Sequence, residues 1–158
     1  ISFRDELTTT EDYLSIEVVR FGAEKLQVVK EIDPATLEIP VPSMLLQPLV
    51  ENSIKHGLEP RMAGGTVTLR SRLERDRLII EVEDDGVGIA PGRAHTSGVL
   101  QGTGIGMKNV RERLQVLYGD AAQFDVHSRP GRGTRITLAF PAQSPEADHP
   151  AARASSPF

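Results

Sequence analysis

A polar side chain stands on the apolar face of an expected helix. Asn52 lies three residues after Leu49 and two before Ile54, so helical spacing places its amide beside a buried stripe. A polar group there costs stability unless a ligand, a metal ion or a partner satisfies it. The amide oxygen is a hard donor suited to Mg²⁺, and Lys55 and His56 in the last turn can meet phosphates. A helix end that turns polar at the surface explains the same spacing equally well.

A carboxylate ends an expected strand in a comparable position. Asp84 shares one face, by the two-residue period of a strand, with three apolar residues: Leu78, Ile80 and Val82. A buried carboxylate can accept a hydrogen bond from an exocyclic amine such as that of adenine, and Gly86 and Gly88 allow a ligand to approach closely. An ordinary Asp-Asp-Gly turn is the alternative interpretation.

Three glycines precede an expected helix that begins near Met107: Gly102, Gly104 and Gly106. Their free N–H groups can cradle phosphate, and the N-terminus of the helix adds a favourable dipole for an anion. The spacing does not match the P-loop, because Lys108 does not directly follow a glycine, nor the G-x-G-x-x-G dinucleotide motif. A flexible linker explains the glycines as well.

A fourth polar position opens the last expected strand. Thr134 shares its face with Ile136 and Leu138, so its hydroxyl is expected to point inward. From there it can support Asp84 through a hydrogen bond or a water molecule. A turn residue that simply begins a strand is an equally simple interpretation.

The elements that must position these residues begin with a helix. Apolar residues at helical spacing predict it from Asp5 to about Phe21, and Gly22 ends it. A strand is expected from Leu26 to Ile32, followed by a short extended piece from Leu37 to Val41.

Two further helices carry the candidate residues. Ser43 is expected to cap the helix that holds Asn52, with Pro48 delaying or kinking its first turn and an end near Gly57. The third helix begins near Met107 and stops at Gly119, and its apolar residues are Met107, Val110, Leu114 and Leu117.

Two hairpins, Val67 to Val82 and Phe124 to Phe140, alternate with these helices. They predict an α+β fold, a two-layer sandwich in which helices cover one face of a mixed or antiparallel sheet. The glycine-rich stretch from Gly86 to Gly106 is expected to be a functional loop. We expect an N-terminal helix in residues 1–22, one folded domain in 23–141 that contains the four candidate positions, and a disordered tail in 142–158.

Composition excludes several classes of protein. The 158 residues are 39% hydrophobic and 25% charged, which is typical of a folded domain, and no apolar run is long enough to cross a bilayer. The absence of cysteine excludes disulfides and thiolate chemistry. A net charge of -4 argues against general nucleic-acid binding, and the hairpin arginines are expected to form a solvated face: Arg70, Arg72, Arg75 and Arg77. The start, Ile1-Ser2-Phe3-Arg4, suggests a fragment of a longer chain.

In this order, the four motifs closely resemble the ATP-binding domain of sensor histidine kinases, in the superfamily shared with gyrase and the heat-shock chaperone ATPase. Residues 45–57 (LLQPLVENSIKHG) and 104–114 (GIGMKNVRERL) are similar to the LytS-type, autolysin-sensor subgroup. The resemblance covers about Leu7 to Pro141 and implies a Bergerat-type ATP-binding fold.

The resemblance implies a role for each matching residue. Asn52 would coordinate Mg²⁺, with Lys55 and His56 near the phosphates. Asp84 would bind the adenine amine, in a pocket that Gly86 and Gly88 shape and Thr134 supports. Residues 90–101 would form a mobile lid, and the phosphate-binding hinge would follow it: Gly102, Gly104, Ile105, Gly106 and Met107.

Two features separate the chain from hydrolytic relatives and from a complete kinase. Hydrolytic members carry a water-activating glutamate four residues before the metal-binding asparagine, where this chain has Pro48. Glu51 is about 100° around the helix from Asn52 and does not simply replace it. None of the four histidines fits the phosphoacceptor role, which the family places on an upstream helix.

The leading hypothesis is the ATP-binding catalytic domain of a two-component histidine kinase, with ATP and Mg²⁺ as cofactors. Its partners would be the phosphoacceptor-histidine helix of the same kinase and a response regulator. The full protein would be a membrane-anchored homodimer with this domain in the cytoplasm, and the isolated fragment a monomer without autophosphorylation. The alternative is a non-catalytic module of the same fold that binds nucleotide or a partner.

Overall fold

The computed structural model describes residues 1–60, 63–88 and 105–142. Helix α1 (Phe3–Phe21) leads into strand β1 (Leu26–Ile32), a 3-10 turn (Pro34–Thr36) and helix α2 (Gln47–Asn52), which continues as a π-helical turn, η2 (Ser53–Leu58). Strands β2 (Gly65–Glu74) and β3 (Arg77–Asp84) follow. Helix α4 (Ile105–Tyr118) and the hairpin of β4 (Gln123–Arg129) and β5 (Gly133–Pro141) complete the described elements.

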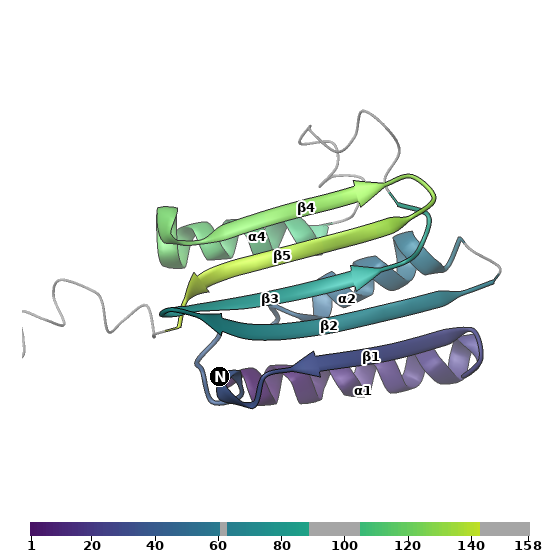
Figure 1. Cartoon of the computed structure of the whole chain (residues 1–158), viewed down its shortest axis with the longest axis horizontal. Helices are drawn as coiled ribbons and strands as arrows, with labels where there is room; N and C mark the ends of the chain where they lie inside the picture. The colour runs from purple at the N-terminus through teal and green to yellow at the C-terminus, as the bar shows by residue number, and fades with distance from the viewer. Residues whose placement is uncertain (61–62, 89–104, 143–158) are drawn as a thin grey trace, which may run out of the picture.

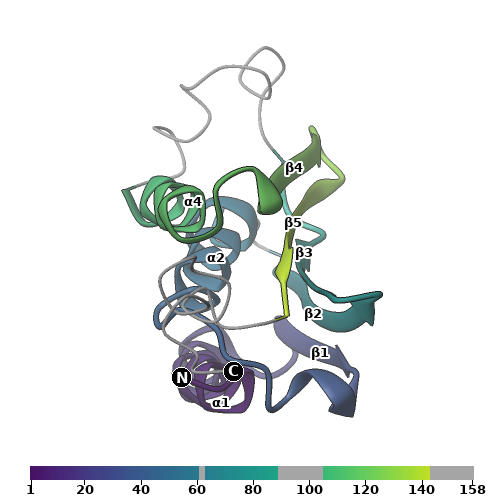
Figure 2. The ribbon, with the colours of Figure 1, turned by 90° about the vertical axis from the view of Figure 1, so that its left-hand side faces the viewer.

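The five strands form one mixed sheet in the order β1-β2-β3-β5-β4. β1 pairs with β2 in parallel, and the other neighbours are antiparallel. Helices α1, α2 and α4 lie on one side of this sheet, with α1 behind β1 and α4 behind the β4–β5 hairpin (Figures 1 and 2). The fold is therefore the two-layer α+β sandwich that the sequence predicted.

The core fills the space between the two layers. Strand residues at the two-residue period, among them Val67, Leu69, Ile80 and Val82, meet helix residues such as Ile54. Each of these side chains is at most 1% exposed. Burial of a large aliphatic side chain contributes about 1.5–3 kcal/mol, so this layer supplies the main driving force for folding. Leu117, which the sequence pattern placed on the apolar stripe of the third helix, is 42% exposed.

The opposite face of the sheet carries paired charges. Arg70 contacts Glu31 at 3.0 Å and Glu83 at 3.0 Å, and Arg72 contacts Glu74 at 2.8 Å and Glu81 at 3.2 Å. These two arginines therefore belong to a partly solvated ion-pair network on an open sheet face.

The start of α2 differs from the prediction. The segment does not become helical at Ser43, because α2 begins at Gln47 and its N-cap position, Leu46, has no side-chain hydrogen bond. Instead the buried Glu6 carboxylate of α1 accepts three backbone N–H groups, from Met44 at 3.1 Å, Leu45 at 2.8 Å and Leu46 at 3.0 Å. A residue about forty positions away thus supplies the acceptor expected from Ser43. The expected extended piece from Leu37 to Val41 is reduced to one bridge, between Ser2 and Pro40.

None of the helices in the described ranges is both long and apolar enough to span a membrane. The expected lid, residues 90–101, and the expected tail beyond Ala142 lie outside the described residues.

Candidate nucleotide-binding site

Asp84 is buried at the end of β3, as the strand period predicted. Its side chain is 3% exposed, and its Oδ1 accepts the Gly86 N–H at 2.9 Å. Burial raises the pKa of Asp84 to about 6, while the N–H groups of Gly86 and Thr134 and the Ser53 hydroxyl oppose that rise. A buried carboxylate held by the backbone on one side is a suitable acceptor for a ligand amine.

The helix layer approaches Asp84 through a glycine. A Cβ on Gly57 would lie 2.6 Å from Asp84 Oδ1, and a Cβ on Gly86 would lie 2.2 Å from the Gly57 carbonyl oxygen. Both contacts are shorter than a side chain tolerates, so the close packing of η2 on the end of β3 requires glycine at these two positions.

The turn after Asp84 is fixed on two sides by the backbone of one residue. Val87 N–H donates to the Gly57 carbonyl at 3.0 Å, and the Val87 carbonyl accepts the Gly131 N–H at 2.7 Å. Gly88, with φ +72, passes close to the Arg129 carbonyl, where a Cβ would be only 2.2 Å away. The helix layer and the β4–β5 turn therefore hold the Asp84–Gly88 segment between them.

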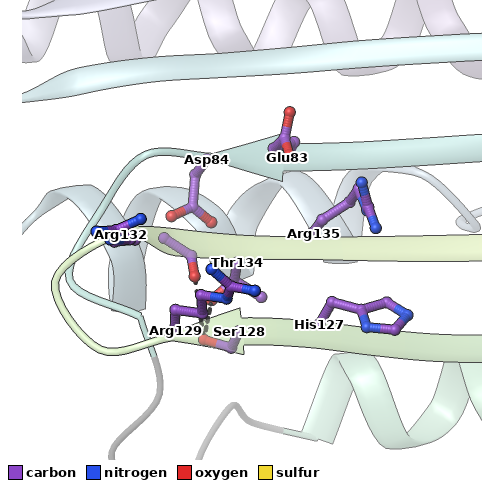
Figure 3. A pocket seen from close by; sticks show the side chains of 9 residues that line it. Glu83, Asp84, His127, Ser128, Arg129, Arg132, Thr134 and Arg135 are labelled. Carbon is purple, nitrogen blue, oxygen red and sulfur yellow. Dashed lines mark hydrogen bonds between the residues drawn. The ribbon is translucent and has the colours of Figure 1, made fainter.

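Thr134 lies directly opposite Asp84 in the β3–β5 register and is 7% exposed. Its backbone N–H, rather than its hydroxyl, stabilises the Asp84 carboxylate. The hydroxyl forms a hydrogen bond with Ser128 Oγ at 2.9 Å (Figure 3). The inward orientation expected for Thr134 thus places it beside Asp84, with its hydroxyl already engaged on β4.

Asn52 ends α2 with its side chain 7% exposed. Its amide oxygen Oδ1 has no hydrogen-bond partner among the described residues. An unsatisfied buried acceptor is costly, so this oxygen fits the predicted role as a ligand for Mg²⁺. No three His, Asp or Glu side chains in the described ranges gather as a metal site, so such an ion would depend on the phosphates of a nucleotide for its remaining ligands.

Ser53, the next residue, lies beside Asp84. Its hydroxyl is near enough to help lower the pKa of that carboxylate, yet its geometry completes no hydrogen bond with any described residue. Two neighbouring orphaned polar atoms, on Asn52 and Ser53, therefore accompany the buried carboxylate. Lys55 and His56 follow on η2 with exposed side chains, free to meet an anionic group from solvent.

The expected phosphate hinge is described only in part. Gly106, at the start of α4, faces α2, where a Cβ would lie 3.2 Å from Cβ of Pro48. Met107 is 1% exposed and belongs to the hydrophobic core. Gly102 and Gly104 lie outside the described residues, and so does the side chain of Ile105.

Glu51 faces away from this cluster. Its Oε1 accepts the Gln47 side-chain amide at 3.0 Å. Its negative charge also contributes, after burial and Glu17, to raising the pKa of Tyr13 on α1 to about 12. Glu51 therefore lies toward α1.

Sequence reasoning missed three residues of this site. Gly57 appeared only as a helix end, although a glycine directly after Lys55 and His56 could have signalled close approach. Ser53 stood inside the quoted motif without a role. Ser128 gave no local signal, because its contact with Thr134 depends on the β4–β5 register.

Comparison with known proteins agrees with this geometry. The family model described as "Histidine kinase-, DNA gyrase B-, and HSP90-like ATPase" matches residues 40–144. The sensor histidine kinase YpdA of Escherichia coli is 37% identical over 145 residues, covering 90% of this chain and 25% of that protein. The sensor protein LytS of Staphylococcus saprophyticus is 32% identical over 146 residues, covering 89% of this chain and 24% of that protein. The chain thus spans about a quarter of the length of these relatives.

Solved structures show the same fold. The histidine kinase domain of the blue-light activated histidine kinase from Erythrobacter litoralis superposes with a TM-score of 0.62 at 25% identity, covering 84% of this chain and 59% of that chain. The catalytic domain of the histidine kinase ThkA has a TM-score of 0.69 at 13% identity, covering 90% of this chain and 97% of that chain.

The chain therefore belongs to the histidine kinase-, gyrase- and HSP90-like ATPase family, with sensor histidine kinases, LytS among them, as relatives. This confirms the resemblance drawn from the order of the motifs. Family membership supports an ATP-binding catalytic domain of the histidine-kinase type.

Proposed function

We propose that this domain binds Mg-ATP and presents the γ-phosphoryl group to a histidine on an upstream helical segment of the same sensor kinase. The observation that carries the proposal is the packing of the buried Asp84 carboxylate against Gly57, one helical turn from the unsatisfied Asn52 amide oxygen. The Asp84 carboxylate suits the amine of the base at one end of a nucleotide, and the Asn52 amide oxygen suits a magnesium ion on the phosphates at the other end.

Asp84 would recognise the adenine base. Its carboxylate can accept a hydrogen bond from the exocyclic amine of adenine, which guanine replaces with a carbonyl oxygen that would face the carboxylate unfavourably. The N–H groups of Gly86 and Thr134 fix the orientation of the carboxylate in advance. Base selection would therefore need no large rearrangement of β3.

Asn52 would hold the magnesium ion. When bound, Mg²⁺ supplies positive charge that offsets the negative charge of the phosphates. Lys55 and His56 follow Asn52 on the next turn with exposed side chains, from which they would contact the same phosphates. On a domain of net charge -4, local cations of this kind are needed to hold a triphosphate.

Phosphoryl transfer is favoured over hydrolysis. Pro48 has no group that could activate water, and Glu51 is engaged with Gln47. In the proposed transfer a bond forms between the imidazole nitrogen and the γ-phosphorus while the bond to the bridging oxygen breaks, and ADP leaves. A response regulator would then accept the phosphoryl group from that histidine. The parent protein would be a membrane-anchored dimer with this domain in the cytoplasm.

Calorimetric titration tests the proposal. We expect ATP or a non-hydrolysable analogue to bind more tightly with Mg²⁺ than in EDTA, and more tightly than GTP. The full-length kinase should become labelled on histidine by γ-labelled ATP, and the isolated chain should not. Equal affinity for ADP and the analogue, without any dependence on Mg²⁺, would instead indicate the non-catalytic module.

A further inference from the structure

A cavity opens at the ends of β3 and β4 and the start of β5, on the sheet face that the helices leave uncovered (Figure 3). Its volume is about 360 Å³, and its lining holds three arginines and a histidine together with two carboxylates: Glu83, Asp84, His127, Ser128, Arg129, Arg132, Gly133, Thr134 and Arg135. Glu83, Arg135 and His127 form one cross-strand row, and this row is offset by one residue from the inward-facing row of Asp84 and Thr134. Because successive strand residues point to opposite faces, the row that contains Arg135 and His127 faces away from the predicted adenine pocket. We call it the basic row.

The cations of this cavity have no partner within the described ranges. No ion pair involves Arg129, Arg132 or Arg135 there, although all three side chains are exposed. The one open-face glutamate in the lining, Glu83, is already paired with Arg70 at 3.0 Å. By contrast, the neighbouring Arg70 and Arg72 form ion pairs with a total of four glutamates.

These unpaired arginines lie on a domain that is acidic overall. The chain has 22 acidic and 18 basic side chains, so carboxylates are abundant, yet three arginines gather where none pairs with them. Like charges that share a cavity repel one another, and an anion that enters relieves the repulsion. Guanidinium groups also match oxyanions through paired, parallel hydrogen bonds.

We propose that this cavity, which we call the hairpin cavity, binds a small polyanion with two or more phosphate or carboxylate groups. Arg129 and Arg135 approach it from paired strands, Arg132 from the turn that joins them, and His127 extends the basic row (Figure 3). Asp84 and Thr134 also belong to its lining, so the hairpin cavity adjoins the proposed ATP site at the start of β5, while its arginines lie outside the residues assigned to nucleotide binding. An anion bound to Arg135 in the hairpin cavity would lie next to Thr134, the residue whose backbone N–H stabilises the Asp84 carboxylate.

Titration with inorganic pyrophosphate in EDTA, at constant ionic strength, tests this site. We expect one binding event, with amide NMR shifts centred on residues 127–135. Arg129→Gln and Arg135→Gln should each weaken binding about tenfold, which corresponds to the loss of one charge-assisted hydrogen bond. Citrate at the same ionic strength shows whether carboxylates serve as well as phosphates, and binding of either anion at this cavity supports the proposal.

Arg75→Gln is the matched control, because it removes one exposed arginine from the turn at the far end of β3. It should leave pyrophosphate affinity unchanged. The proposal is overturned if neither anion binds, if Arg75→Gln weakens binding as much as Arg135→Gln does, or if the shifts centre on η2 and α4.

Discussion

The Asp84 carboxylate occupies the space that a side chain on Gly57 would need, since a Cβ there would lie 2.6 Å from Oδ1. We therefore expect Gly57→Ala to displace the carboxylate and to weaken ATP binding by at least about tenfold, the effect of losing one well-placed hydrogen bond. Overpacking should also lower the free energy of unfolding by about 1–3 kcal/mol. Calorimetry and thermal melting measure the two effects.

The control for this substitution is Gly119→Ala, where no atom lies within 4 Å of the added Cβ. Its φ of +57 adds only backbone strain, about 1–2 kcal/mol, far from the site. ATP affinity should be unchanged. If Gly57→Ala binds ATP as tightly as this control, the contact between η2 and Asp84 does not shape the pocket.

Asp84→Asn should have opposite effects on stability and on nucleotide binding. The pKa of Asp84 is raised from 3.8 to about 6, so the folded state holds this proton more tightly than the unfolded chain does. Stability therefore increases as the pH falls through 6 toward 4, and the charged form costs up to about 3 kcal/mol at neutral pH. We expect the variant without nucleotide to be more stable than the parent at pH 7.5, by an amount that shrinks toward pH 5.

The same variant should lose the preference for ATP over GTP, and in the parent protein ATP affinity should fall as the pH drops below about 6. Protonation of the carboxylate removes the acceptor for the adenine amine. Denaturant melts at several pH values and calorimetry with both nucleotides test this paired outcome. A variant that is destabilised at pH 7.5 would show that the carboxylate is not under a desolvation penalty.

Asn52→Ala should weaken nucleotide binding only when Mg²⁺ is present. Its Oδ1 is unsatisfied among the described residues, so removal of the amide deletes no protein hydrogen bond made by that oxygen. Titrations in Mg²⁺ and in EDTA should give about a tenfold loss and no loss, respectively. Losses of equal size under both conditions would contradict the metal role.

Glu6→Gln should destabilise the domain by about 1–3 kcal/mol. An amide oxygen can still accept the N–H groups of Leu45 and Leu46, but the NH₂ group would face the Met44 N–H, which now meets Oε2. Glu24→Gln changes an exposed side chain on the loop before β1 and is the control. Equal melting temperatures for the two variants would show that Glu6 does not organise the approach to α2.

ATP hydrolysis by the isolated chain should stay near background, because Pro48 cannot activate water. Glu51→Gln should leave that background unchanged, since the carboxylate is bound to Gln47. Phosphate release over hours is the measurement. Brisk release that Glu51→Gln abolishes would show that Glu51 is the base.

Local sequence patterns predicted most of the fold correctly. The limits of β1, the two hairpins and the inward position of Asp84 follow from side-chain alternation, which depends only on neighbours along the strand. The predicted cap at Ser43 was wrong because the acceptor, Glu6, comes from another helix. The parallel pairing of β1 with β2 is likewise a long-range choice that no local period specifies.

The site was predicted less completely than the fold, for the same reason. Asn52 and Asp84 each lie on an apolar face, and that can be seen in sequence. The role of Gly57 depends on how closely η2 approaches β3, and the hydrogen bond from Ser128 to Thr134 depends on the register of β4 on β5. The sequence therefore pointed to the acceptors, and tertiary packing determined what surrounds them.

The N-terminal end of α1 is tied to the chain that leads into α2. Besides the Glu6 bonds, Phe3 N–H donates to the Ile39 carbonyl at 2.9 Å, and Val41 N–H donates to the Ile1 carbonyl at 2.7 Å. These bonds make the start of α1 and residues 39–46 a single mechanical unit. A rotation or translation imposed on the first turn of α1 must either break these bonds or carry the start of α2 with it. Because Asn52 lies at the other end of that short helix, we expect force on the N-terminus to move Asn52, the proposed magnesium ligand.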